Sequence, residues 1–280
     1  MIDNNQIVQY YDRCEIDYRM IWHLGSRMSM HYGYWDENTR LLRQALRNIN
    51  AFLAARVDVR SGETVLDAGC GVGGSAIYLA ATRAARVTGI TLSAQQVRRC
   101  RGNAIRNNVT ERTKFDRRDF TATGLPSGSF DVVWAIESVC HTQCKADFLR
   151  EAYRLLRPGG RLCVADFYRR NLDPQSAEFR LVRKWARCWA VPDFAVITDF
   201  EADAHAAGFR RLERFDITAN IRPSAKRLYY AFFPSLLVAL LGELVRVRER
   251  IQTENVWSAC YQYRALKQGL WRYYVITAEK

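Results

Sequence analysis

A carboxylate beside a glycine-rich turn is the feature whose residue types and spacing most clearly suggest chemistry. Asp67 ends an apolar run of strand length, and the turn that follows contains Gly69, Gly71, Gly73 and Gly74. Glycine lets the backbone approach a ligand closely or take positive φ angles. The amide groups at the start of the next helix face the same pocket. These residues therefore predict a strand, turn and helix that hold a ligand.

Asp67 indicates the type of ligand. Gly69, Gly71 and Gly74 satisfy the G-x-G-x-x-G pattern of dinucleotide binders, which expects a pyrophosphate at the helix start and an acidic residue about 20 positions further on. Residues 89–93 supply no acid, and a carboxylate at position 67 would repel a pyrophosphate. The same carboxylate suits a cationic ligand with an ammonium group. We favour such a ligand over a dinucleotide and over a glycine turn that serves only the fold.

Glu137 and His141 form a second candidate group. They follow a predicted buried strand, residues 129–136, and lie where side chains emerge beyond the carboxyl end of a parallel sheet. Either side chain could act as a general base, directly or through water. The alternatives are a carboxylate that only supports the ligand site, and a histidine that packs in the core or bonds to the segment covering the pocket.

A metal site is also considered, because Cys140, His141 and Cys144 are close together. Adjacent Cys and His with a second Cys four residues on do not have the usual ligand spacing, and no fourth ligand is near. We expect no metal held by the protein. A magnesium ion could still arrive with a diphosphate substrate.

The elements that must position these residues alternate in type. From Val65 onward strands alternate with helices, which implies a parallel sheet with right-handed crossovers. Ser93 and Thr198 stand where helix caps are expected, and Gly208 stands at a helix end. One predicted strand ends at residue 67, and a short strand with its turn covers residues 114–120. The other predicted strands cover residues 86–90, 129–136, 161–167, 211–217 and 270–277. The predicted helices are residues 75–80, 94–107, 147–156 and 198–209.

Three segments fall outside this alternation. Residues 1–35 are dense in aromatic side chains and precede a helical stretch around residues 39–55. We expect this leader to cover the pocket mouth and exclude water, with plain core packing as the alternative. Residues 169–198 and 219–266 are expected to form a helical cap.

Residues 228–241 form the most apolar window of the chain. The window has only about 14 residues and contains Pro234, whereas a membrane span needs about 20, so we expect no transmembrane segment. We expect it to form the wall of an apolar substrate pocket. A helix for self-association into a homo-oligomer and contact with a membrane surface are the alternatives.

The length and composition of the chain limit the class of protein it can be. The 280 residues allow one large α/β domain with a cap, and 49% hydrophobic residues exclude a mostly disordered chain. No secretory signal pattern opens the sequence, and eight cysteines without paired C-x-x-C units indicate reduced thiols, so a cytoplasmic protein is expected. The net charge of +13 comes from scattered arginines. This excess of positive charge could reflect compositional bias, an anionic substrate or binding to nucleic acid.

Two motifs carry a resemblance to a known family. Residues 66–74, LDAGCGVGG, resemble the first motif of the S-adenosylmethionine-dependent methyltransferases with a Rossmann-like fold. Residues 89–96, GITLSAQQ, resemble the variant of sterol methyltransferases and cyclopropane fatty acid synthases, in which residues matching Thr91 and Gln96 contact the ribose in place of an acid. Residues 9–12 and 136–141 resemble sterol C-methyltransferases. The nearest likeness is to sterol, tocopherol and terpenoid types.

The resemblance implies an α/β fold: a Rossmann-like, seven-stranded, mostly parallel sheet with a helical cap from the N-terminal leader and two C-terminal inserts. It implies a helical lid over residues 1–58 and a methyltransferase core over residues 59–280, with the cofactor half at residues 60–170. S-adenosylmethionine is the implied cofactor, and Asp119 would accept a hydrogen bond from its adenine amino group while Phe120 lies against the base. The implied cofactor residues are Asp67, Gly69, Gly71, Thr91, Leu92, Gln96, Asp119, Phe120 and Ile136.

Methyl transfer from a sulfonium needs mostly proximity and orientation. An alkene acceptor adds two requirements, aromatic faces that tolerate a carbocation and a base that removes a proton. The catalytic candidates are Glu137, His141 and Tyr11, and the substrate candidates are Tyr10, Trp22, Tyr32, Trp185, Phe232 and Phe233.

We expect C-methylation of an isoprenoid or other small lipophilic alkene, such as a prenyl diphosphate or a sterol-like compound. The alternative is O- or N-methylation of a phenolic or amine metabolite, with His141 removing a proton from the heteroatom. A subunit that binds the cofactor without turnover is disfavoured by the plausible bases Glu137 and His141. Nucleic-acid methylation is disfavoured because no base-specific motif is found.

Overall fold

The computed structural model describes residues 2–21 and 24–280, apart from the side chains of residues 26 and 27. A central sheet runs through this part of the chain in the order β3-β2-β1-β4-β5-β8-β7, with the two-residue β6 beside β5. The pairs from β3 to β5 are parallel, and β8 runs antiparallel to both β5 and β7. The seven-stranded, mostly parallel sheet expected from the sequence is thereby confirmed. The strands are β1 Thr64–Ala68, β2 Arg86–Thr91, β3 Thr113–Arg117, β4 Phe130–Ile136, β5 Leu156–Arg169, β6 Ala195–Val196, β7 Arg210–Asp216 and β8 Trp271–Glu279.

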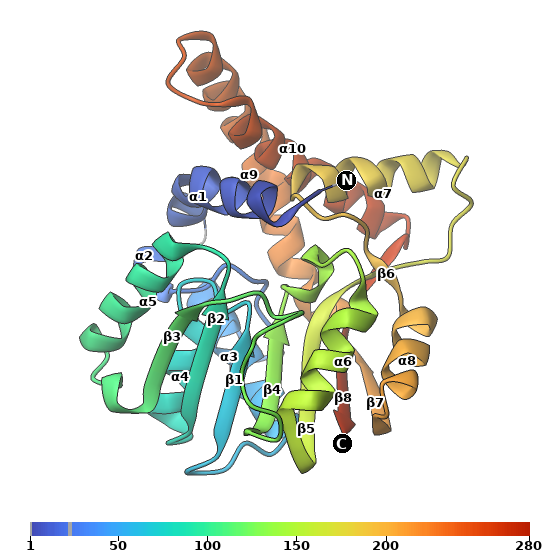
Figure 1. The fold of residues 1–280 in the computed structure, drawn as a ribbon. Coiled ribbons are helices and arrows are strands. Elements are labelled where there is room, and N and C mark those ends of the chain that lie inside the picture. The colour runs from blue at the N-terminus through green and yellow to red at the C-terminus, as the bar shows by residue number, and fades with distance from the viewer. Residues whose placement is uncertain (1, 22–23) are drawn as a thin grey trace.

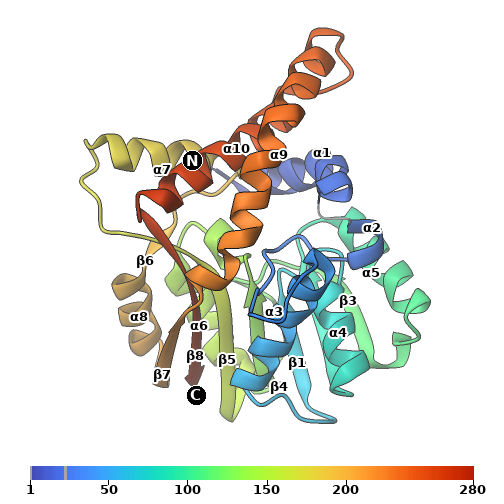
Figure 2. The same ribbon diagram turned by 180° about the vertical axis from the view of Figure 1, so that it is seen from behind.

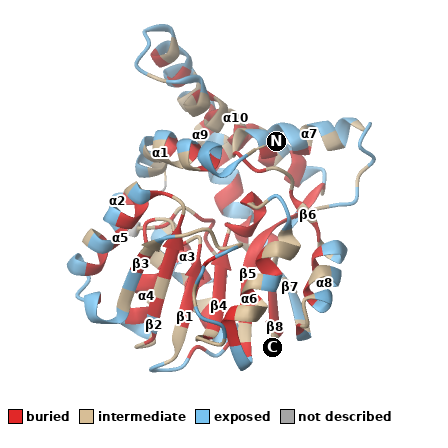
Figure 3. Ribbon diagram, viewed as in Figure 1, coloured by how far each residue is buried: buried red, intermediate tan, exposed pale blue. Residues whose placement is uncertain are grey.

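Helices cover both faces of the sheet (Figures 1 and 2). Strand side chains alternate between the faces, so that Val65 belongs to the core cluster that includes residues of α3 and α4, whereas Leu66 belongs to the cluster that includes residues of α6 and α8. The sheet interior is therefore buried on both sides (Figure 3). The helices are α1 Asn4–Ile21, α2 Leu24–Arg27, α3 Leu42–Arg56, α4 Gly74–Thr82, α5 Ala94–Arg106, α6 Lys145–Leu155, α7 Ala177–Cys188, α8 Ile197–Ala206, α9 Thr218–Leu244 and α10 Arg250–Lys267, with short 3-10 helices η1 Thr110–Arg112 and η2 Val139–His141.

Several element ends differ from the sequence prediction. The third strand ends at Arg117, within the strand and turn predicted over residues 114–120. Helix α8 begins at Ile197 after Val196, so Thr198 lies inside the helix and is not its cap. Ser93 does cap α5, because its side chain accepts a hydrogen bond from the backbone amide of Gln96. The local cap pattern therefore predicted the start of α5 correctly. It placed the cap of α8 at Thr198, two residues after the observed cap, Val196.

A helical cap lies over the carboxyl edge of the sheet (Figures 1 and 2). It contains α1, α7, α9 and α10, of which α10 contacts the other three. The cap therefore combines the leader with both C-terminal inserts, although these segments are far apart in the sequence.

Helix α9 is longer than the apolar window suggested. It runs for 27 residues with Pro223 and Pro234 inside it. By length and composition alone it could cross a membrane, and 17% of its apolar window is buried inside the protein. The absence of a transmembrane segment therefore stays a prediction.

Candidate active site

A cavity of about 270 Å³ lies at the carboxyl ends of β1 and β4. The strand order reverses between these two strands, which is where ligands bind in open α/β sheets. Every residue expected from the sequence to be catalytic or to bind the cofactor lines this cavity. They are Tyr11, Asp67, Gly69, Gly71, Thr91, Leu92, Gln96, Asp119, Phe120, Ile136, Glu137 and His141.

The glycine turn brings two strand ends close together. Gly69 has a φ of +84°, and a Cβ there would lie 2.3 Å from the Cβ of Ser138. The Ser138 hydroxyl donates a hydrogen bond of 2.7 Å to the carbonyl of Ala68. Glycine at position 69 thus lets the end of β1 contact the segment that follows β4.

Asp67 is buried beneath this turn. Burial raises the pKa of its carboxyl to about 7, against a hydrogen bond from the backbone amide of Ala76 that lowers it. Its Oδ2 atom has no hydrogen-bond partner in the described part of the chain. An unpaired buried carboxylate oxygen costs free energy, so this atom is available to a cationic donor in the cavity.

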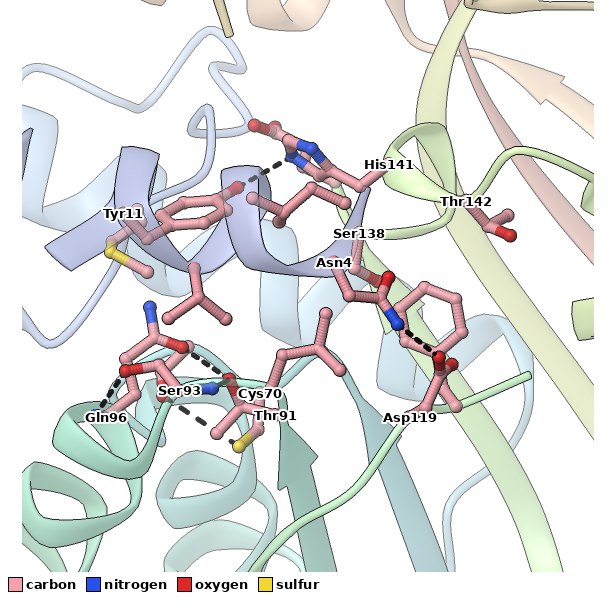
Figure 4. A pocket seen from close by; sticks show the side chains of 18 of the residues that line it. Asn4, Tyr11, Cys70, Thr91, Ser93, Gln96, Asp119, Ser138, His141 and Thr142 are labelled. Atoms are coloured by element: carbon pink, nitrogen blue, oxygen red, sulfur yellow. Dashed lines mark hydrogen bonds between the residues drawn. The ribbon is translucent and has the colours of Figure 1, made fainter. Parts of the chain in front are cut away.

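Thr91 and Gln96 form a pair at the end of β2. The Thr91 hydroxyl donates to the Gln96 side-chain carbonyl at 2.5 Å (Figure 4). Because that carbonyl is occupied, the amide NH₂ group of Gln96 is left as a donor to a ligand hydroxyl. Ser93, which lies between them, donates to Asp12 at 2.7 Å and ties α1 to the start of α5.

Asp119 lies at the other end of the cavity, beside Phe120. Its Oδ1 accepts from the hydroxyl of Thr121 at 2.7 Å, and its Oδ2 accepts from the Asn4 side chain at 2.7 Å (Figure 4). Asn4 belongs to α1, so the first turn of this helix lies at the cavity mouth. The contact of Asp119 with an adenine amino group remains a prediction.

Glu137 takes a left-handed conformation directly after β4, with a φ of +49°. Its Oε1 accepts from the Tyr32 amide at 2.7 Å and from the Tyr273 hydroxyl at 2.9 Å. Burial raises its pKa to about 8, although both hydrogen bonds lower it. A non-glycine residue with positive φ is strained and is held in place by its surroundings. Here the two hydrogen bonds to Oε1 hold Glu137 where the chain passes from β4 into η2.

His141 ends η2 and faces Tyr11 across the cavity (Figure 4). Its Nδ1 lies 3.2 Å from the carbonyl oxygen of Ala190, and its Nε2 lies 2.8 Å from the Tyr11 hydroxyl. Burial lowers the pKa of His141 to about 4. A carbonyl can only accept, so the neutral ring carries its proton on Nδ1. Nε2 is therefore an acceptor, and Tyr11 donates to it.

Hydrogen bonds with Asp166 and Lys145 hold the turn that carries His141. Asp166 accepts from the backbone amide of Cys140 at 2.9 Å. The ammonium group of Lys145 donates to the carbonyl oxygens of Cys140 at 3.1 Å and Thr142 at 2.7 Å. These contacts hold the imidazole in one orientation.

A smaller inner chamber of about 60 Å³ shares Tyr11, Met30, Glu137 and His141 with the first cavity. Its other walls are largely aromatic. No Lys or Arg lines either space among the residues that the structure describes. The aromatic residues of the inner chamber are Tyr10, Tyr11, Tyr18, Tyr32, Phe167, Trp189 and Phe232.

Three substrate candidates from the sequence require comment. Trp185 is fully buried and packs against Phe167, Phe194 and Trp271, so it belongs to the core and not to a cavity wall. Phe233 is 55% exposed and points away from the chamber. The prediction that Trp185 and Phe233 line the substrate cavity was wrong, because the sequence does not show which side of a helix faces inward. Trp22 lies outside the described residues.

Other residues at the site were missed from the sequence. Tyr273 comes from the last strand, and Trp189 and Asp166 are brought in by packing. His31 lines the larger cavity, its Nδ1 contacts the Tyr32 carbonyl, and its Nε2 has no partner among the described residues. The available signal for His31 was its place in the Met- and aromatic-rich leader.

Comparison with known proteins identifies the family. A family model for the methyltransferase domain matches residues 66–164. The 27-O-demethylrifamycin SV methyltransferase of Amycolatopsis mediterranei is 35% identical over 198 residues, which cover 70% of this chain and 72% of the relative. The chain belongs to the S-adenosylmethionine-dependent methyltransferases.

Solved structures of low sequence identity share the fold. The cyclopropane synthase MmaA2 from Mycobacterium tuberculosis superimposes with a TM-score of 0.83 at 17% identity, covering 100% of this chain and 99% of that one. The geranyl diphosphate C-methyltransferase from Streptomyces coelicolor A3(2), in complex with Mg²⁺, geranyl diphosphate and S-adenosyl-L-homocysteine, has a TM-score of 0.75 at 18% identity, covering 99% and 97%.

The residues of this methyltransferase fit S-adenosylmethionine as its cofactor. The unpaired Oδ2 of Asp67 suits the ammonium group of the amino-acid end. Gly69 and Gly71 line the same cavity, and Gln96 offers a donor to the ribose. Among the described residues no group of three His, Cys, Asp or Glu side chains could hold a metal ion.

Proposed function

We propose that this methyltransferase transfers the methyl group to a hydroxyl oxygen of a small lipophilic natural product, with His141 as the general base. The observation that carries the proposal is the neutral imidazole of His141, which lines both cavities and whose Nε2 accepts a hydrogen bond from the Tyr11 hydroxyl. O-methylation was the alternative from the sequence. The name of the relative, 27-O-demethylrifamycin SV methyltransferase, indicates methylation at an oxygen and supports the same class of acceptor atom.

The mechanism uses His141 and the groups that orient it. The acceptor hydroxyl takes the place of the Tyr11 hydroxyl, or bonds to it, and donates toward Nε2. As the oxygen forms its new bond, its proton moves to Nε2, and the imidazolium is stabilised by the Ala190 carbonyl at Nδ1. When bound, the cofactor supplies an electrophilic methyl group on sulfur. Asp67 would hold its ammonium group and Gln96 its ribose, and α1 would exclude water at the mouth.

The charge of the walls favours a neutral acceptor. A diphosphate is normally bound by Arg, Lys or a metal ion, and the described walls of both cavities contain neither Arg nor Lys. Asp17 also lies at the inner chamber. We therefore favour a neutral, apolar acceptor whose reacting end enters the inner chamber over a prenyl diphosphate.

C-methylation of an alkene is the second candidate. It is supported by the aromatic walls, which could stabilise a carbocation, and by Glu137, whose carboxylate has a pKa raised to about 8. The fold likeness to a geranyl diphosphate C-methyltransferase agrees with it but shows the fold alone.

The test is turnover with methyl-labelled cofactor and a panel of phenols, hydroxylated polyketides and prenylated alkenes, followed by assignment of the labelled atom. We expect methyl ethers. His141→Asn should lower kcat by about 10²- to 10⁴-fold and leave the affinity for S-adenosylhomocysteine unchanged. His205→Asn is the matched control, because His205, on α8, contacts the backbone carbonyl of Phe209 and lines neither cavity.

Label found only on carbon would reject O-methylation. Loss of turnover in Glu137→Gln with full turnover in His141→Asn would transfer the base role to Glu137 and support the second candidate.

A further inference from the structure

We propose that the tip of the α9–α10 hairpin, residues 233–249, docks this protein on an anionic membrane surface by inserting its apolar face among the lipids. The tip projects from the cap, away from the sheet (Figures 1 and 2). Apart from Ser235, which lines the inner chamber, its residues line neither cavity of the active site.

The tip exposes large apolar side chains. Six of them between residues 237 and 245 are 49% to 78% exposed, namely Leu237, Val238, Leu240, Leu241, Leu244 and Val245. Soluble proteins rarely expose such a continuous patch without a partner. Figure 3 shows the contrast between this tip and the buried sheet below it.

The apolar side chains lie on one side of α9. At 100° per residue, positions 237, 238, 240, 241 and 244 cover an arc of about 160°. The buried residues Ala239 and Gly242 lie on the other side, and Gly242 faces the aliphatic part of Arg248. No charged residue interrupts residues 228–242. An amphipathic wedge of this form is suited to the boundary between lipid head groups and acyl chains.

Basic residues flank the wedge. Residues 222–250 contain six basic and two acidic side chains. Arg246 and Arg250 are exposed at the tip, and Lys226 and Arg227 are exposed toward its base. Arg248 bonds to Asp17 of α1 at 2.9 Å, which fixes the hairpin to the cap. Exposed Arg and Lys around an apolar face complement anionic lipid head groups.

The same charges oppose self-association. A symmetric dimer through this face would place each basic flank near its own copy, because the same patch contacts itself. Like charges across an interface are unfavourable. A membrane surface has no such repulsion.

Docking by insertion fits the geometry better than crossing the bilayer. The uncharged run of 15 residues, 228–242, is shorter than the roughly 20 residues that a span requires. The first half of α9 is also packed into the cap, with Ile221, Ala225, Leu228 and Phe232 buried. Only the second half is free to enter lipid.

The wedge adjoins the acceptor site. Leu228, Ala231, Phe232 and Ser235 of α9 line the inner chamber, whereas the exposed face begins with the residues that follow. A docked enzyme would hold this chamber near the bilayer, where a lipophilic acceptor concentrates. The docking itself does not depend on which atom is methylated.

The test is flotation of the full chain with phosphatidylcholine vesicles, with and without phosphatidylserine. We expect binding to the anionic vesicles that weakens with salt. Leu241→Glu combined with Leu244→Glu should reduce the bound fraction at least about tenfold. Ile105→Glu, a similarly exposed apolar position on α5, is the matched control and should bind as the unchanged protein does.

Affinity for S-adenosylhomocysteine, which should be the same in all variants, verifies folding. The proposal is overturned if the unchanged protein does not float with anionic vesicles, or if the double variant floats equally well. It is also overturned if the double substitution instead converts a dimer to a monomer in light scattering, since the face would then belong to a second copy of the chain.

Discussion

Replacing Asp67 by asparagine is expected to stabilise the protein and to weaken its binding of the cofactor. Burial raises the pKa of this carboxyl from 3.8 to about 7. Between these pH values the folded protein keeps a proton that the unfolded chain has released. The contribution of Asp67 to the free energy of unfolding therefore falls as the pH rises from about 4 to about 7.

The size of this effect follows from the two pKa values. A difference between 3.8 and about 7 corresponds to at most about 4 kcal/mol once the group is fully ionised. Asparagine keeps the shape and cannot ionise, so at pH 8 the variant should gain up to this amount, and at pH 4 almost nothing. The cofactor ammonium would lose its charged partner at Oδ2, and we expect about 100-fold weaker binding.

Urea unfolding of the cofactor-free protein at pH 4 and pH 8 measures the first effect, and calorimetric titration with S-adenosylhomocysteine measures the second. Asp131→Asn is the control. Burial raises the pKa of Asp131, but hydrogen bonds from Thr64 and Arg157 outweigh this and hold the pKa below its usual value. This variant should lose stability at pH 8 and keep its affinity. Equal stability of Asp67→Asn and the unchanged protein at pH 8, with equal affinity, would refute the reasoning.

Three further predictions concern the turn, the core and the base. Gly69→Ala should lower the free energy of unfolding in urea by at least about 2 kcal/mol more than Gly159→Ala does. Both positions have positive φ, but only at position 69 would the new Cβ lie against another side chain. Equal losses would show that the turn relaxes freely. Trp185→Phe should lower stability without changing the KM of the acceptor, whereas Trp189→Phe should raise that KM, since only Trp189 lines the chamber. With saturating cofactor, kcat should stay flat from pH 8 down to about 5, because the pKa of His141 is lowered to about 4; a fall centred near 6.5 would contradict this.

Much of the cofactor half could be predicted because its signals are local. The strand, turn and helix around Asp67 lie within consecutive residues, and Thr91 and Gln96 are separated by five positions on one strand end and helix start. Their relative positions follow from backbone geometry once the element types are known. The alternation of strand and helix then determines that their ends meet at one edge of the sheet.

The acceptor half could be predicted only in part. The aromatic residues predicted an apolar space. The hydrophobic periodicity of the sequence did not distinguish Trp185, which packs in the core, from Trp189, which lines the chamber. The same limit applies to Phe232 and Phe233, which are adjacent in α9, although only Phe232 is buried and lines the chamber. A helix shows its inward face only after its partners are placed.

The sequence by itself determined the family, the cofactor and the residues that line the cavity at the glycine turn, because these depend on short motifs with local geometry. Only the tertiary structure decided the state of the bases. Tyr273 reaches Glu137 from the last strand, and Ala190 binds the Nδ1 proton of His141 from a cap insert. Protonation depends on burial and on hydrogen-bond partners, and both come from chain segments that are distant in sequence and meet only in the folded protein.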